Sequence, residues 1–352
     1  MLLVHASSQY ITALRNITIE ASEDCSLQTR VTSGNLTFDR ELRRPEEIAM
    51  LIRVGYEIAV EVAAPTAVYS YLNVHAEHRQ DVIWSSFGQP NASPFKDIHG
   101  NECQRLLMEP GETVFSYDAV VKVSGAPDFF DDDADQVTPN DLPMECLPYL
   151  LGSRYCETDR LSQIAWKRFG NITKGAHRVR AICDFVNNYL TFSYGYARST
   201  RTALEAYEER VGACRDFAHL AITLCRALNI PARYVNGFMG DIGVVPDPSP
   251  MDYNAWVEVF LDGRWFTVDA RHNQPRIGRI VVARGRDASD IPLFSTFGPH
   301  QLNRFEVWTE EFDGKQPTMQ RQAPAVRTSS RYGPAGRSPL DLGVSSFVHA
   351  MI

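Results

Sequence analysis

Cys214 is the residue whose type and position most directly indicate chemistry. It follows Gly212-Ala213 and begins a segment, 214–228, that we expect to be helical. One face of this expected helix is apolar and consists of Phe217, Leu220, Ala221, Leu224 and Leu228. The first turn of a helix has unpaired backbone N–H groups and a positive partial charge. A thiol there should ionise more readily than a free cysteine, and the thiolate is the nucleophile.

A lone cysteine is more often a small buried apolar residue, so a nucleophile also needs a base and an orienting group. Two strand-like segments, 254–261 and 264–270, are joined by Leu261-Asp262-Gly263, which is typical of a hairpin turn. With that turn at the centre, we expect Asn254 and Asp269 to face each other across the hairpin. A cysteine at a helix start and two opposed polar side chains form the arrangement of a catalytic triad.

The composition is that of a globular protein and excludes several classes of function. The 352 residues are 44% hydrophobic and carry a net charge of -8, which disfavours a nucleic-acid partner. No apolar run approaches the roughly 18 residues of a membrane-spanning helix, and the N-terminus lacks the pattern of a secretion signal. The seven cysteines contain no Cys-x-x-Cys pair, which favours reduced thiols in the cytoplasm over disulfides or a zinc site. We therefore expect no metal and no membrane contact.

The catalytic residues must be positioned by a core that follows a separate β-rich region. Residues 52–62 alternate between apolar and polar side chains, as a half-buried strand does. In the segments after residue 158, the patterns of helices come before the patterns of strands. This order predicts an α+β core with an antiparallel sheet. The sequence thus predicts five parts: an N-terminal extension, 1–49; an all-β N-terminal domain, 50–125; a linker, 126–158; the core, 159–312; and a disordered tail, 313–352.

The two segments that carry the chemistry resemble the transglutaminase-like superfamily of bacterial cysteine enzymes. The resemblance rests on G-A-C-R-D-F-A-H-L-A-I-T-L-C-R-A-L-N-I-P-A-R-Y-V-N-G-F and on N-A-W-V-E-V-F-L-D-G-R-W-F-T-V-D-A-R-H-N. It is strongest to the two-domain bacterial branch, whose β-rich N-terminal region precedes the catalytic core. The resemblance implies a papain-like α+β fold and a Cys-His-Asp triad, in which Cys214 matches the nucleophile and Asp269 matches the orienting acid.

The histidine of that triad is replaced. The family commonly reads H-A-W-x-E where this chain has Asn254-Ala255-Trp256-Val257-Glu258. Asparagine has no titratable nitrogen and cannot accept the thiol proton. Three explanations are open: a natural inactive or repurposed member, an engineered substitution, or another histidine as the base. His272, three residues after Asp269, is the alternative base. His219 is discounted, because it lies on a different side of the expected helix from Cys214.

Two functions follow from these residues. The first is a cysteine hydrolase or acyltransferase that attacks a peptide, protein or small-amide carbonyl, forms a Cys214 thioester and passes the acyl group to water or an amine. The backbone N–H of Cys214 would stabilise the oxyanion, and no metal or organic cofactor is needed. The second is an inactive relative that binds a peptide or protein partner in the same cleft. Trp256 is either a core aromatic residue or part of that cleft's wall.

Overall fold

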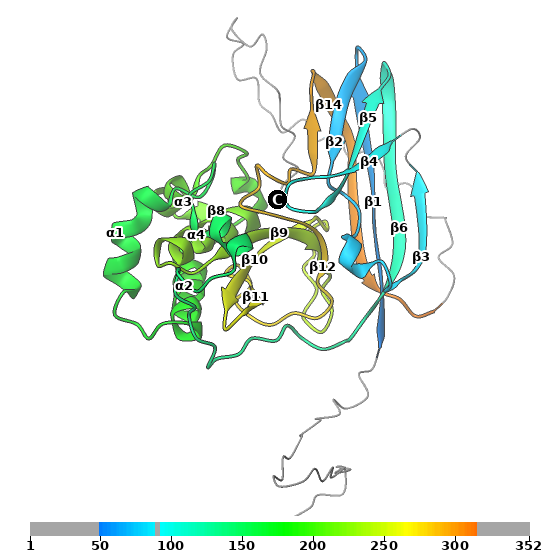
Figure 1. Ribbon diagram of the computed structural model, residues 1–352. Coiled ribbons are helices and arrows are strands. Elements are labelled where there is room, and N and C mark those ends of the chain that lie inside the picture. The colour runs from blue at the N-terminus through cyan, green and yellow to red at the C-terminus, as the bar shows by residue number, and fades with distance from the viewer. Residues whose placement is uncertain (1–48, 89–91, 315–352) are drawn as a thin grey trace, which may run out of the picture. The chain divides into compact units, whose positions relative to one another are not determined.

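The computed structural model describes residues 49–88 and 92–314, all of which belong to one compact unit, Glu47–Ile352 (Figure 1). The predicted extension, 1–49, and the predicted tail, 313–352, therefore fall almost wholly outside the described residues. The described part combines helices with antiparallel sheets, which confirms the predicted α+β class. Within 49–88 and 92–314, no helix has the length and apolar character needed to cross a membrane.

Two four-stranded sheets make up the β-rich part of this unit. The first has the order β14-β1-β6-β3, from β14 (His300–Glu311), β1 (Met50–Val62), β6 (Gly111–Val123) and β3 (Val82–Gly88). The second has the order β13-β2-β5-β4, from β13 (Phe294–Thr296), β2 (Thr66–Ser70), β5 (Glu102–Met108) and β4 (Ser93–Lys96). The sheets share a core in which the rings of Phe115 and Phe294 have centroids 5.0 Å apart.

The C-terminal strands of the described chain complete these two sheets. β14 pairs with β1 over Ile52–Val62, and β13 pairs with β2 over Val68–Ser70, both antiparallel. The sequence-based division placed 294–311 in the catalytic core, whereas their pairing partners lie more than 200 residues earlier in the chain. Local periodicity predicts a strand but not a partner at such a distance, so the division differs here from the observed pairing.

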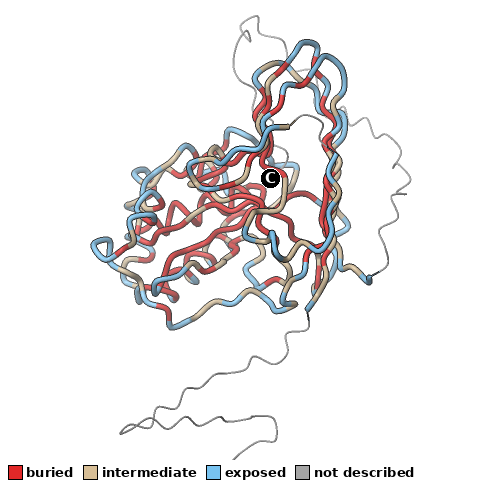
Figure 2. The backbone as a smooth tube through the Cα atoms, turned by 45° about the vertical axis from the view of Figure 1, so that its right-hand side comes forward, coloured by how far each residue is buried: buried red, intermediate tan, exposed pale blue. Residues whose placement is uncertain are grey.

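The core contains four α-helices on one sheet. The helices are α1 (Thr158–Phe169), α2 (Ala176–Tyr189), α3 (Ala203–Glu209) and α4 (Cys214–Ala227). The sheet has the order β11-β10-β9-β12, from β11 (Arg264–Val268), β10 (Asn254–Leu261), β9 (Ala232–Phe238) and β12 (Ile280–Gly285). The helix α4 contacts the three other helices as well as β9 and β10 (Figure 1). Its residues are nearly all buried, as Figure 2 shows for the interior of the core.

Short elements connect these parts. They are the short strands β7 (Thr191–Phe192) and β8 (Val211–Gly212), which pair in parallel, and the 3-10 helices η1 (Ala76–His78), η2 (Met144–Leu150) and η3 (Tyr194–Tyr196). The sheets and the core are tied together by direct hydrogen bonds. The hydroxyl of Tyr253 donates to the carbonyl of Leu72 at 2.8 Å, and the N–H of His75 donates to the carbonyl of Val281 at 2.8 Å.

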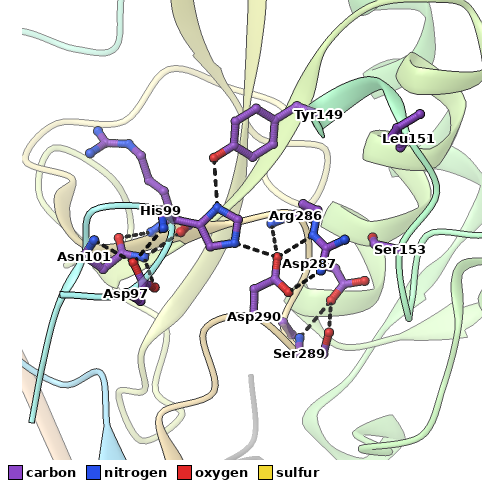
Figure 3. A network of polar contacts seen from close by, with 12 residues as sticks. Asp97, His99, Asn101, Tyr149, Leu151, Ser153, Arg286, Asp287, Ser289 and Asp290 are labelled. Atoms are coloured by element: carbon purple, nitrogen blue, oxygen red, sulfur yellow. Dashed lines mark hydrogen bonds and ion pairs between the residues drawn. The ribbon is translucent and has the colours of Figure 1, made fainter. Parts of the chain in front are cut away.

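A polar network around His99 also joins the two regions (Figure 3). The Nε2 of His99 lies 2.9 Å from Oδ2 of Asp290, and its Nδ1 lies 3.3 Å from the hydroxyl of Tyr149. Arg286 donates two side-chain hydrogen bonds to the same Asp290, each of 2.9 Å. The network thus fixes the segment that leaves the core sheet and leads to β13.

Candidate active site

The start of α4 is fixed by a buried carboxylate. Asp216 accepts the backbone N–H of Ala213 at 2.9 Å and a guanidinium N–H of Arg201 at 3.1 Å. A Cβ added to Gly212 would lie 2.6 Å from the Cβ of Asp216, so only glycine fits directly before this turn. These contacts hold the first residue of the helix, Cys214, in place and confirm the helix start that the sequence predicts.

Burial dominates the chemistry of the Cys214 thiol. The residue is only 2% exposed, and its burial raises the pKa of the thiol to about 11. Arg271 and a hydrogen bond from the backbone N–H of Ala255 lower this pKa, whereas Asp252 and Asp269 raise it. The expectation of a readily ionised thiol is therefore wrong for this structure. The helix start and one arginine do not offset the cost of a charge placed in a low-dielectric interior.

Arg271, rather than Asp269, faces Asn254. The hairpin pairs Leu261 with Arg264, so its loop has two residues, Asp262-Gly263, and the last pair of the ladder is Val257 with Val268. A guanidinium N–H of Arg271 donates to Oδ1 of Asn254 at 3.3 Å. The sequence-based expectation that Asn254 and Asp269 face each other is wrong, because Asn254 lies three residues beyond Val257 and Asp269 only one residue beyond Val268. Two successive positive φ angles, 47° and 78°, allow the two-residue turn.

Asp269 is the centre of a charged cluster. Its Oδ2 accepts from Arg279 at 2.8 Å and lies 2.9 Å from Nδ1 of His272. Its Oδ1 accepts the backbone N–H groups of Arg271 at 2.9 Å and His272 at 3.1 Å. Burial alone would raise the pKa of Asp269, but Arg279 and His272 hold it well below its ordinary value. Asp269 is therefore a carboxylate that orients a histidine, although that histidine is His272 and does not stand at position 254.

The turn that carries His272 is itself anchored. Asn187 of α2 donates to the carbonyls of Ala270 at 3.1 Å and Arg271 at 2.6 Å. Asn273, at a φ of 51°, donates to Asp184 of α2 at 2.7 Å. These bonds fix the turn on α2, so the imidazole of His272 has a defined position beside Asp269.

A cavity of about 770 Å³ opens beside this cluster. Its wall includes Asn254, Arg271 and His272, together with Tyr194, Met239, Asp247 and Asp252. The segment 239–252, which begins in the glycine-containing loop after β9, forms much of that wall. Cys214, which is 2% exposed, is not one of the residues that line the cavity.

Trp256 is a core residue. It is 1% exposed and packs in a buried cluster with Val235 and Val281. The guanidinium of Arg279 lies over its ring, 5.0 Å from the ring centre. Of the two roles that the sequence left open for Trp256, the observed packing corresponds to the core aromatic residue.

Three site residues were not found from the sequence. Arg271 and Arg279 belong to an arginine-rich stretch whose individual partners only the fold reveals. Asp252 lies two residues before Asn254, ahead of the first residue of β10, and no local pattern in the sequence identifies it.

Comparison with known proteins shows which proteins this chain resembles. Residues 163–270 match the family model described as the transglutaminase-like superfamily. Residues 163–270 are therefore similar to the core of that superfamily. A solved structure of a proposed cysteine protease from Cytophaga hutchinsonii is 29% identical, covers 75% of this chain and 91% of its own, and superposes with a TM-score of 0.66.

Two uncharacterized mycobacterial proteins are also similar. One from Mycobacterium leprae is 27% identical over 147 residues, which are 41% of this chain and 53% of that protein. One from Mycobacterium tuberculosis is 36% identical over 128 residues, which are 32% of this chain and 39% of that protein. The chain thus spans about half, or less, of the length of the curated relatives that it matches.

Proposed function

We propose that this chain is a transglutaminase-like cysteine hydrolase or acyltransferase that acts on amide or peptide carbonyls through a thioester on Cys214. The observation that carries this proposal is the place of Cys214, at the start of α4 and beside a backbone N–H of β10 and the Arg271 guanidinium. The description of the Cytophaga hutchinsonii protein as a proposed cysteine protease supports the same reaction class. Peptides, proteins or small amides are the substrates, and the cytoplasm is the compartment.

The chemistry follows from the atoms at the helix start. The sulfur attacks the carbonyl carbon, and the developing oxyanion accepts the backbone N–H of Cys214 at the positive end of α4. Collapse of this intermediate expels an amine and leaves the thioester, which water or a second amine then cleaves. No metal or organic cofactor takes part in these steps.

Asn254 makes this reaction slow in the chain as it stands. The amide cannot take the thiol proton, and a thiol with a pKa of about 11 is almost fully protonated at neutral pH. Asn254→His supplies a base at the position whose side chain contacts Arg271, next to Ala255 in the chain. We expect it to raise the rate of peptide-amide hydrolysis by about 10²-fold or more.

The experiment compares the wild-type chain, Asn254→His and Asn254→Gln, each with and without Cys214→Ala. Release of ammonia from peptide amides and intact mass of the acyl-enzyme are the readouts. The proposal predicts activity that rises in Asn254→His only and disappears in every Cys214→Ala partner. Activity that survives without Cys214 contradicts it.

A second function, an inactive binding protein, is favoured by one specific observation. The cavity is lined by Asn254, Arg271 and His272, whereas the buried Cys214 lies outside its wall. In such a cavity a peptide binds and is not attacked by Cys214. This function predicts that peptide binding, measured by calorimetry, is equal in the wild-type chain and Cys214→Ala, while Asn254→His creates no hydrolysis.

A further inference from the structure

Arg271 is a half-buried cation in the wall of the cavity, and it pairs with no carboxylate among residues 49–88 and 92–314. Its Nη1 donates to Oδ1 of Asn254 at 3.3 Å, and within those residues this is the one hydrogen bond of the guanidinium. The Nε and Nη2 atoms are thus unengaged there. They present two parallel N–H groups on one edge of the guanidinium, which is the geometry that matches both oxygens of a carboxylate.

The guanidinium of Arg271 is held in place by its surroundings. The backbone N–H of this residue donates to Oδ1 of Asp269 at 2.9 Å, and its carbonyl accepts from Asn187 at 2.6 Å. The guanidinium carbon lies 3.8 Å from the centre of the Phe192 ring, so one face of the group is stacked. A cation whose position is already fixed loses little conformational freedom when it binds an anion, which favours binding.

Asn254 orients Arg271 without neutralising it. The side-chain Nδ2 of Asn254 donates to the carbonyls of Met239 at 3.4 Å and Asp252 at 3.2 Å, which directs Oδ1 of the same amide to the guanidinium. A carboxylate at position 254 would cancel the arginine charge, and a protonated imidazole would add a second cation beside it. An amide oxygen is a neutral acceptor, so the charge of Arg271 is left for another anion.

The other cationic side chains of the cavity wall are already occupied. Arg276 donates to Oδ1 of Asp241 at 3.1 Å, and both residues line the cavity. The Nδ1 of His272 lies 2.9 Å from Oδ2 of Asp269. Among the described residues of the wall, Arg271 is therefore the arginine that is available to an anionic ligand.

Two further acidic residues of the wall determine which anion fits. Burial raises the pKa of Asp252 to about 8, so this group is mostly uncharged at pH 7. Asp247 is exposed and keeps its charge, since the backbone N–H of Ser249 lowers its pKa. Asp247 forms no ion pair with Arg271, but its charge repels a doubly charged phosphate more strongly than a singly charged carboxylate.

We propose that Arg271 binds a carboxylate of a peptide in this cavity, so that the substrates of the site are acidic peptides, and that Asn254 is the positioning residue that holds the guanidinium for them. This inference rests on the proposed function, because it names the substrate class of the same site. The carboxylate belongs either to an acidic side chain or to the C-terminal end of the peptide. Either source offers two oxygens to Nε and Nη2 as a bidentate pair.

The test measures binding apart from chemistry. Three N-acetylated peptides are titrated by calorimetry into the full chain with Cys214→Ala, at pH 7 and low ionic strength, where charge pairs are least screened. They are the Ala-Glu-Ala amide, the Ala-Gln-Ala free acid and the neutral Ala-Gln-Ala amide, so the two sources of carboxylate are compared at nearly equal size. Each titration is repeated with Arg271→Met, with Asn254→Asp and with Arg264→Met, a control at the exposed hairpin.

We expect at least one of the two charged peptides to bind about tenfold more tightly than the neutral peptide. Asn254→Asp places a carboxylate of the same size against Nη1, so it should abolish this preference, as Arg271→Met should. Arg264→Met should keep the preference. Thermal unfolding checks the fold of each variant, and Asn254→Asp, which retains Arg271, decides the outcome if Arg271→Met does not fold.

Equal affinities for the three peptides, or no binding of any of them, overturn this inference and leave the proposed function standing. So does a preference for a charged peptide that survives in folded Arg271→Met or in Asn254→Asp. Peptide-amide hydrolysis is measured separately, in Asn254→His with and without Cys214→Ala. Hydrolysis that survives Cys214→Ala overturns the proposed function, whereas the calorimetric preference does not depend on acyl transfer.

Discussion

The guanidinium of Arg271 lowers the pKa of the Cys214 thiol, against the larger effect of burial. The sequence identified Cys214 at the beginning of a helix, and the structure confirms that position. It did not reveal that the thiol is buried, because burial depends on how α4 packs against β10 rather than on the local pattern. Arg271 was not assigned as the partner of Asn254, because their side-chain contact lies beyond the last pair of the ladder, Val257 with Val268, where the strand pattern no longer applies.

Removal of the Arg271 charge should make Cys214 less reactive. In Arg271→Met the long apolar stem is retained, and its stacking on Phe192, 3.8 Å from guanidinium carbon to ring centre in the wild-type chain, is largely replaced by methionine contacts. We expect the Cys214 pKa to rise by about one unit, so that alkylation at pH 9 slows by about tenfold. Iodoacetamide labelling with peptide mapping measures this. The matched control, Arg264→Met at the exposed hairpin, should react as the wild-type chain does.

The elements that hold the site are α4, the β10–β11 hairpin and the turn after β11. Their types follow from the sequence: apolar spacing predicts α4, and alternation around Asp262-Gly263 predicts the hairpin. The hydrogen bonds that link these elements do not follow from the sequence. Arg279, in the segment before β12, donates to Asp269, and Asn187 of α2 donates to the turn after β11. Side-chain contacts of this kind arise from tertiary packing, which leaves no local periodicity.

Asp269→Asn should lower the free energy of unfolding, because it breaks a buried ion pair that links these elements. The substitution leaves the Arg279 charge, 5% exposed, without one of its two carboxylate partners, and such a loss costs about 3–5 kcal/mol. The folded-state pKa of Asp269 is depressed, so its contribution is present above the unfolded pKa of about 3.9 and fades as the pH falls below it.

Urea unfolding at pH 7 and pH 3 measures this difference. The free-energy gap between the wild-type chain and Asp269→Asn should be larger at pH 7 than at pH 3. The control is Asp131→Asn, which removes the partner of exposed Arg264 and should cost less than about 1 kcal/mol. If Asp269→Asn and Asp131→Asn lost the same free energy of unfolding at pH 7, Asp269 would stabilise the protein no more than an exposed carboxylate does.

Over the described unit, the core and the β-rich sheets depend on each other. β14 covers one side of β1 along Ile52–Val62, and β13 adds to the edge of β2. The His99–Asp290 contact and the bond from Tyr253 to Leu72 cross between the same regions. The sequence predicted both regions. It did not predict that β13 and β14, which follow the core in the chain, pair with strands of the β-rich region.

Deletion of residues 294–352 should therefore abolish the cooperative fold. It removes β13 and β14, exposes the full edge of β1, and leaves apolar partners such as Phe115 uncovered. Thermal unfolding followed by circular dichroism measures this. Deletion of 315–352 alone leaves every described pairing in place and is the control. A sharp melt at the wild-type temperature after the longer deletion would mean that the two regions fold independently.

The central claim is that Cys214 is a nucleophile whose base is missing at position 254. Its most direct test is the rate of Cys214 alkylation by iodoacetamide from pH 6 to 11, in the wild-type chain and in Asn254→His. We predict that the wild-type rate rises only toward a pKa of about 11, and that Asn254→His shifts the rise to well below the roughly 8.5 of a free cysteine. A reactive thiolate near pH 7 in the wild-type chain, or identical profiles in the two chains, would contradict this account.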